Sequence, residues 1–195
     1  MTVSRTWPRQ LRTALTALVA MTLLTGLLYP LLVWGIGQLA FGWQANGSLL
    51  ERDGQVVGAR HIGQPFDGDR WFHPRPSAAG DGYDSMASGG SNLGPENRRL
   101  INSIERNRAS IAERNGVRPG QVPPDAVTAS SSGLDPHISP AYATIQVDRV
   151  AQARDLSPAT VRGLVAEHTD GRMLGFLGEP VVNVLQLNLE LDQAR

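Results

Sequence analysis

No charged residue occurs between Thr13 and Leu50, and most residues in this stretch are apolar. A helix needs about 20 predominantly apolar residues to cross a bilayer, so one span fits with residues to spare. Pro30 interrupts the run, but membrane helices tolerate proline better than exposed soluble helices do. The alternative is a cleaved signal peptide, whose apolar region is typically only about 7–15 residues long. The length of the run therefore predicts a retained transmembrane anchor over residues 13–43.

Three arginines, Arg5, Arg9 and Arg12, lie on the N-terminal side of this run. Positive charge beside a span is usually kept in the cytoplasm. We therefore expect a single-pass protein of the cell inner membrane, with residues 1–12 cytoplasmic and residues 44–195 forming an extracytoplasmic domain. The rest of the chain carries fifteen arginines, the eighteen of the whole chain less these three, against eighteen acidic residues. This mildly acidic balance argues against nucleic acid as a partner.

Lysine and cysteine are both absent from the chain. Without lysine the chain lacks the side chain with which a P-loop reaches the β- and γ-phosphates, and it cannot form a Schiff base. Without cysteine it forms no disulfide, thiolate nucleophile or cysteine-ligated zinc site. The four histidines show no recognised metal-ligand spacing, and no serine lies in a G-x-S-x-G elbow. The sequence therefore predicts neither a metal site nor catalytic residues.

The part of the chain after the anchor begins with a turn signal and continues in a long segment without periodicity. Asp53–Gly54 lies between the apolar pairs Leu49–Leu50 and Val56–Val57, which predicts a β-hairpin. The segment Gly58–Pro95 is rich in Gly, Pro, Ser and Asp but also contains aromatic residues. Flexible linkers lack such aromatics, so this composition predicts a long ordered loop.

Three helices are expected from their start and stop signals. The first follows a cap region at Asn92–Pro95 and stops at Asn115–Gly116. The other two begin at Ser139–Pro140 and Ser157–Pro158, where a serine precedes proline at the first helical position. Residues 122–129 carry a double proline and then a short apolar run, which predicts a loop that enters a strand.

In residues 181–192 leucines alternate with polar residues, and this period of two favours a strand. Val181, Val184, Leu185 and Leu189 would also line one face of a helix, so the helix stays open as an alternative. The elements together predict a mixed α/β fold class, in which a single N-terminal transmembrane helix is followed by one α+β extracytoplasmic domain.

The segment FHPRPSA, residues 72–78, holds a guanidinium between two prolines. Proline fixes the backbone around Arg75, and a fixed guanidinium is suited to a carboxylate or a phosphate. Such an arrangement serves a partner contact or an internal ion pair, and the sequence leaves both open. Asp135 and His137 lie in a turn before a predicted helix, and we take them, with Arg75 and Pro76, as candidates for partner docking. An anchored external enzyme that uses Asp135 and His137 is an alternative.

The segment SGGSN contributes Ser88, Gly89, Gly90, Ser91 and Asn92. Paired glycines permit positive φ, and backbone N–H groups there and at a following helix start can bind an anion. A glycine-serine turn before a helix is also a common structural element. A nucleotide-binding loop and a rigid turn are both compatible with the segment. The turn is favoured because no lysine or Walker pattern accompanies the glycines.

Six segments follow the anchor in a fixed order: GSLLERDGQVVGARHIGQPF, WFHPRPSA, SGGSNLGPEN, VPPDAVTASSSGLDPHISP, RVAQAR and PVVNVLQLNL. In this order they closely resemble the C subunit family of the bacterial Kdp potassium-transporting ATPase. Each segment alone is a weak signal, but six in order, covering the chain from the anchor to about Asp192, are highly specific.

The resemblance implies a non-catalytic subunit of a membrane complex that imports K⁺ with high affinity, driven by ATP. Its partners would be a channel-like potassium-binding subunit and a P-type pump subunit, and it would assemble or stabilise the complex and assist the pump. The family is also proposed to act as a catalytic chaperone that raises the pump subunit's affinity for ATP, here by direct nucleotide binding at Ser88–Asn92. The predicted topology conflicts with that role, because an extracytoplasmic loop does not meet cytoplasmic ATP. We therefore expect no bound cofactor, with ATP as the alternative.

Overall fold

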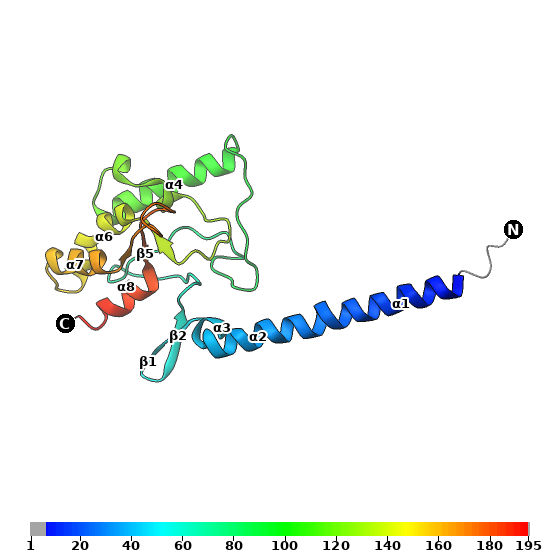
Figure 1. Cartoon of the computed structure of the whole chain (residues 1–195). Helices are drawn as coiled ribbons and strands as arrows, with labels where there is room; N and C mark the ends of the chain where they lie inside the picture. The colour runs from blue at the N-terminus through cyan, green and yellow to red at the C-terminus, as the bar shows by residue number, and fades with distance from the viewer. Residues whose placement is uncertain (1–6, 195) are drawn as a thin grey trace. The chain divides into compact units, whose positions relative to one another are not determined.

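The computed structural model describes residues 7–194 and divides the chain into two units, the first ending at Leu49 and the second beginning at Leu50. The first unit is mainly a long apolar helix, and the second is a domain of helices and short strands (Figure 1). The predicted fold class, one N-terminal apolar helix followed by an α+β domain, is confirmed. Arg5 lies outside the described residues. The placement of the two units relative to the membrane stays a prediction.

The apolar helix runs from Trp7 to Ala40. It consists of α1 (Trp7–Leu23), the π-helical segment η1 (Leu24–Leu28) and α2 (Tyr29–Ala40). At 1.5 Å per residue its 34 residues span about 50 Å, more than the roughly 30 Å of a bilayer's hydrocarbon core. Among the described residues it is the one helix long and apolar enough to cross a membrane. The helix starts before the predicted range 13–43, so it also contains Arg9 and Arg12.

The π-helical segment lies just before Pro30, and the proline explains it. Proline has no N–H, and its ring clashes with the carbonyl four residues earlier, so regular α-helical bonding is lost there. The N–H of Tyr29 donates instead to the carbonyl of Leu24, five residues back, which widens the turn. The disturbance is local, because α-helical structure continues to Ala40.

The first unit ends in a hydrogen-bonded turn after α3 (Gly42–Ala45). The indole N–H of Trp43 donates to the carbonyl of Leu49 over 2.9 Å, and the N–H of Ser48 donates to the carbonyl of Trp43 over 3.0 Å. Phe41 and Trp43 are exposed. Exposed aromatic residues at the end of an apolar helix are typical of a membrane–water boundary.

The domain begins with the predicted hairpin, formed by β1 (Leu49–Arg52) and β2 (Gln55–Ala59). Its turn residues Asp53 and Gly54 have φ angles of 52° and 75°. Two-residue hairpin turns need such left-handed values, and an Asp-Gly pair adopts them readily. After β2 the described chain contains no helix or strand before α4 (Arg98–Asn115), which confirms the predicted long loop.

The three predicted helices are present as α4, α6 (Pro140–Ala153) and α7 (Pro158–Glu167). Ser139 and Ser157 cap α6 and α7 as predicted, each accepting a hydrogen bond of 3.0 Å from the N–H three residues later. The predicted cap region 92–95 was wrong for α4, because Asn97 accepts the capping bond of 2.8 Å instead. The predicted stop is confirmed, since Gly116 ends α4 with a left-handed φ of 63°.

A small antiparallel sheet lies among these helices, with its strands in the order β3-β5-β4. The strands are β3 (His137–Ile138), β5 (Val181–Asn183) and β4 (Thr169–Asp170). Ile138 and Thr169 both pair with Val182, so this valine is at the centre of the sheet, and it is fully buried. The sheet therefore joins the turn at His137 to the C-terminal part of the chain.

The predicted strand after the double proline was wrong. A 3₁₀ turn, η2 (Pro119–Gln121), is followed by the short helix α5 (Pro124–Val127). Pro124 occupies the first helical position, where its fixed φ suits a helix and its missing N–H costs nothing. Ala126 and Val127 are buried on the core side of this turn. A short apolar run can thus be buried by one helical turn as well as by a strand.

The predicted strand over residues 181–192 was also wrong beyond its first three residues. β5 ends at Asn183, and the chain continues as α8 (Val184–Leu191), so the helical alternative is correct there. Asn183 caps this helix by accepting a hydrogen bond of 3.1 Å from a backbone N–H. Leu187 and Leu191 then lie four residues apart on one buried face.

The core of the domain is formed by one cluster of buried apolar residues from the long loop, the sheet and the helices. Its largest fully buried members are Phe72, Ile138, Val147, Val150, Val161, Val182, Val184, Leu187 and Leu191. Asp192, just after α8, contacts Arg52, Arg70 and Arg154 at 2.7–3.4 Å. These ion pairs tie the end of α8 to the hairpin and to the long loop.

Candidate functional site

The long loop passes through the interior of the domain at Phe72 and His73, where its backbone needs hydrogen-bond partners. The side-chain amide of Asn188 accepts from the N–H of Phe72 at 2.9 Å and donates to its carbonyl at 3.0 Å. The amide of Gln146 does the same for His73, at 2.7 and 3.1 Å. Both amides are at most 1% exposed. Buried backbone groups are almost always paired, and here two side chains supply the partners.

A half-buried arginine of α6 fixes the same part of the loop. Arg149 donates to the carbonyls of Asp69 and Trp71, and to the side-chain oxygen of Gln146 at 2.8 Å. Its Nε donates to the side chain of Asn115 at the end of α4, at 2.9 Å. Burial lowers the pKa of Arg149 below its usual range. The loop is therefore a fixed part of the domain, and it holds the next residues, His73 to Pro76, in place.

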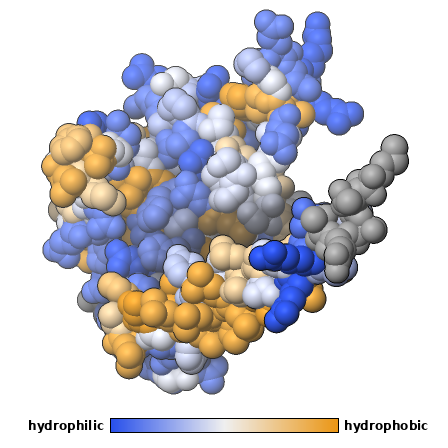
Figure 2. Space-filling view, turned by 45° about the vertical axis from the view of Figure 1, so that its right-hand side comes forward, coloured by the Kyte–Doolittle hydropathy of each residue, from blue (hydrophilic) through white to orange (hydrophobic). Residues whose placement is uncertain are grey.

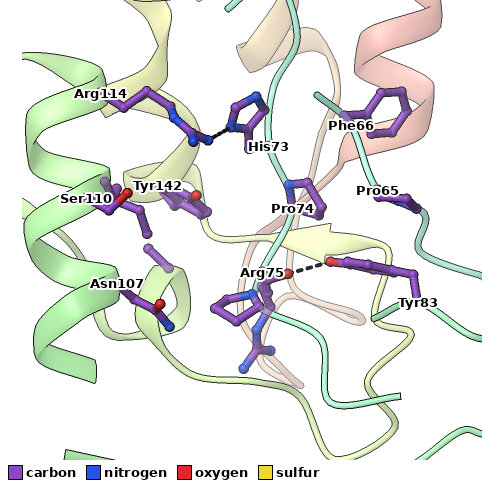
Figure 3. Close-up of a pocket in the computed structure, with 13 residues that line it drawn as sticks. Pro65, Phe66, His73, Pro74, Arg75, Tyr83, Asn107, Ser110, Arg114 and Tyr142 are labelled. Carbon is purple, nitrogen blue, oxygen red and sulfur yellow. Dashed lines mark hydrogen bonds between the residues drawn. The ribbon is translucent and has the colours of Figure 1, made fainter. Parts of the chain in front are cut away.

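A surface pocket opens beside this fixed segment (Figure 3). His73, Pro74 and Arg75 form one wall from the loop, and α4 forms the facing wall with Asn107, Ser110 and Arg114. The remaining lining residues are Pro65, Phe66, Pro76, Tyr83, Ile111, Ala126 and Tyr142. Apolar rings and a few charged groups thus converge on one hollow.

His73 is buried at the inner end of this pocket, with both ring nitrogens in use. Its Nδ1 accepts a hydrogen bond from Arg114 over 2.7 Å (Figure 3). Its Nε2 lies 2.9 Å from the carbonyl of Gly68. A carbonyl only accepts, so Nε2 carries the proton and the ring is neutral. Burial lowers the pKa of His73 below its ordinary value of 6.5, and the charges of Arg149 and Arg114 lower it further.

Stability is expected to fall when the pH is lowered from about 7.5 to 5.5, because His73 has a lowered pKa in the folded state. In that range His73 becomes protonated in the unfolded chain but stays neutral in the folded protein. The stabilisation that is present above pH 6.5 is therefore lost as the pH falls. His73→Gln, which can donate and accept without titrating, should flatten this pH dependence in thermal unfolding. His61→Gln, at an exposed histidine, should leave it unchanged; an unchanged slope in His73→Gln would contradict the assignment.

At the outer end of the pocket Arg75 forms an ion pair with Asp135, with 2.9 Å between Nη1 and Oδ2. The other carboxylate oxygen of Asp135 accepts from the backbone N–H of His137 at 3.0 Å and lies 3.3 Å from its Nδ1. Burial alone would raise the pKa of Asp135, but the hydrogen bonds from His137 and the charge of Arg75 outweigh it and lower that pKa. The internal ion pair that the sequence allowed is therefore present, while a partner contact stays a prediction.

The hydroxyl of Tyr83 donates to the carbonyl of Arg75 (Figure 3). Burial raises the pKa of Tyr83 well above its ordinary value, so the ring keeps its proton. Ser77 orders the same turn, since its hydroxyl donates to the carbonyl of Gly133 at 2.6 Å and accepts from the N–H of Tyr83 at 2.8 Å. The backbone around Arg75 is therefore held from several sides.

The segment Ser88–Asn92 packs against the serine-rich segment 130–133. The N–H of Gly89 donates to the carbonyl of Ser132 at 2.9 Å, and the hydroxyl of Ser88 donates to the same carbonyl at 3.0 Å. The helix that follows begins only at Arg98 and has its own cap. The N–H of Gly89 is thus occupied within the protein, which is the geometry of a rigid turn. Nucleotide binding by this segment stays a prediction.

Comparison with known proteins gives a family match that covers both the apolar helix and the domain. The family profile described as "KdpC: K+-transporting ATPase, c chain" matches residues 11–193. The chain belongs to the KdpC family. It is 59% identical to the potassium-transporting ATPase KdpC subunit of Mycobacterium tuberculosis over 186 residues, which cover 95% of this chain and 98% of the relative. The KdpC subunit of Kineococcus radiotolerans is 58% identical over 95% of this chain and 94% of the relative. The KdpC subunit of Gemmatimonas aurantiaca is 59% identical over 94% of this chain and 92% of the relative.

In this KdpC chain the predicted site residues fall into two groups. Arg75, Asp135 and His137 form one hydrogen-bonded cluster, and Pro76 lies beside it in the pocket wall. Among the described residues, Ser88–Asn92 shares no hydrogen bond with this cluster and packs against segment 130–133 instead. Sequence reasoning missed Arg114, Gln146, Arg149 and Asn188, which position the site. Single polar residues on predicted helices give no local signal of what they will contact.

Proposed function

We propose that this chain is a non-catalytic accessory subunit of a potassium-transporting ATPase complex, and that it assembles and stabilises the complex and assists the pump subunit. The anchor crosses the inner membrane with its arginine-rich end in the cytoplasm, and the domain acts on the external side. Its partners are the channel-like potassium-binding subunit and the P-type pump subunit. Membership of the KdpC family and the potassium-transporting ATPase names of its relatives support this proposal.

One observation supports the non-catalytic role: His73 and Asp135, the histidine and the carboxylate that the pocket and the adjoining turn bring together, are both bonded within the protein. His73 is held between Arg114 and a carbonyl, and Asp135 is shared by Arg75 and His137. A catalytic base must reach the proton that it abstracts, and here both ring nitrogens of His73 are already bonded to other groups of the protein. Here the same groups cross-link the long loop to α4 and to the turn before α6. The result is a stiff surface that suits docking to another protein, since rigid surfaces lose little entropy on binding.

Purification of the tagged full chain from membranes that contain the whole complex tests the proposal. The two larger subunits are expected to co-purify in constant proportion, and the purified chain alone should not hydrolyse ATP. Recovery of the chain by itself would contradict the proposal.

Ser88→Ala and Asn92→Ala remove the polar side chains of the glycine-serine segment, and we expect the complex to keep its KM for ATP. A severalfold rise in KM would favour the nucleotide-binding chaperone instead.

A further inference from the structure

The loop between β4 and β5 exposes a cluster of large apolar side chains. Met173, Leu174, Phe176 and Leu177 are 70%, 78%, 68% and 47% exposed, and we call these four residues the apolar tip. The surface in the view of Figure 2 is largely hydrophilic, with apolar residues gathered in a few patches. Single exposed apolar residues need no explanation, but a contiguous group on a soluble domain usually marks a contact site.

The apolar tip is held in a defined shape. Leu177 donates its N–H to the carbonyl of Met173 at 2.9 Å, and the N–H of Gly175 donates to the carbonyl of Arg172 at 3.0 Å. Leu174 and Gly175 have left-handed φ angles of 53° and 81°, as a tight two-residue turn requires. The side chains are therefore displayed from a structured turn, which reduces the entropy lost when they are buried by a partner.

Charged residues surround the base of the apolar tip. Arg172 and Glu179 face each other across it, with 2.6 Å between Nη2 and Oε2. Asp170, at the end of β4, lies 3.7 Å from Arg60. An apolar centre with a polar rim is the usual anatomy of a protein–protein contact. A few apolar anchors of this kind commonly carry most of the binding energy.

We propose that the apolar tip docks into an apolar pocket on the extramembrane surface of another subunit of the same complex. This inference rests on the proposed function, which supplies the partner. Lipid is the other apolar surface that a membrane-anchored domain meets, but segments that bind anionic membranes typically carry excess positive charge beside their apolar residues. From Thr169 to Pro180 the chain has one arginine, which is paired with Glu179, and two acidic residues. The charge of the segment thus favours a protein partner over an anionic membrane.

Cysteine labelling tests this docking, because the chain contains no cysteine and a single substitution introduces one thiol. Leu174→Cys places that thiol on the apolar tip, and Met86→Cys, at a position 92% exposed, is the matched control. Maleimide labelling of each variant is compared between membranes with this chain alone and membranes with the whole complex. We expect the complex to slow labelling of Leu174→Cys at least tenfold and to leave Met86→Cys unchanged.

Equal labelling of Leu174→Cys in both membranes, while the other subunits still co-purify, would overturn the docking and leave the proposed function intact. Loss of co-purification in the unmodified chain would overturn both. An environment-sensitive dye on Leu174→Cys separates lipid from protein. Blue-shifted emission from the chain alone in vesicles would show insertion into lipid and overturn the inference, whereas a blue shift seen only in the complex supports it.

Discussion

Replacing Asn188 with leucine is expected to lower the free energy of unfolding by about 2–5 kcal/mol. Leucine has a similar size, but it leaves both the N–H and the carbonyl of Phe72 without partners in the interior. Each buried polar group left unpaired costs about 1–3 kcal/mol. Asn188 is 1% exposed, so water cannot replace the lost bonds without opening the core.

Thermal unfolding of the detergent-solubilised chain measures this effect. A loss of 2–5 kcal/mol corresponds to a fall in Tm of roughly 5–15 °C for a domain of this size. Asn102→Leu is the matched control, because Asn102 is exposed on α4 and should tolerate leucine with no loss. Equal melting temperatures for Asn188→Leu and the control would show that the side-chain amide does not hold the loop.

Gly133→Ala is expected to destabilise the domain by about 2–4 kcal/mol, through backbone strain and overpacking together. Gly133 has a φ of 67°, which residues with a side chain rarely adopt, and it lies where three loop segments meet. A methyl group there would approach the N–H nitrogen of Ala79 to 2.6 Å and the carbonyl oxygen of Gly89 to 2.7 Å. Both are backbone atoms, so neither can move without shifting its segment.

Gly94→Ala is the control for this substitution, since no atom lies within 4 Å of the added methyl group and its φ is not left-handed. We expect that control to change stability by less than about 0.5 kcal/mol. Chemical unfolding of both variants gives the comparison. If Gly133→Ala unfolded like Gly94→Ala, the close packing of segments 77–79, 88–90 and 130–133 would be refuted.

The elements that could be predicted from the sequence are those set by local chemistry. Ser139 and Ser157 precede prolines and cap α6 and α7, Asp53–Gly54 makes the hairpin turn, and Gly116 ends α4. Each signal needs only its immediate neighbours. The apolar run of the anchor is equally local, because the length and apolarity of one helix decide it.

The parts that were mispredicted or missed depend on distant contacts. The alternating pattern in residues 181–192 favours a strand over a helix, and only the folded domain, which buries Leu187 and Leu191 on one helical face, shows that residues 184–191 are helical. The side-chain amides that hold the loop are far from it in sequence: Gln146 is 73 positions from His73, and Asn188 is 116 positions from Phe72. The ion pair of Arg75 with Asp135 was one of two options, since sequence alone does not show which carboxylate lies near.

The orientation of the anchor is the claim on which the proposed function depends, and labelling of intact cells tests it most directly. Met86→Cys, exposed on the domain, and Gln10→Cys, in α1, each introduce one thiol into a cysteine-free chain. A membrane-impermeant maleimide is expected to label Met86→Cys fully in intact cells and Gln10→Cys only after lysis. The reverse pattern, with Met86→Cys protected until the cells are broken, would place the domain in the cytoplasm and contradict the account.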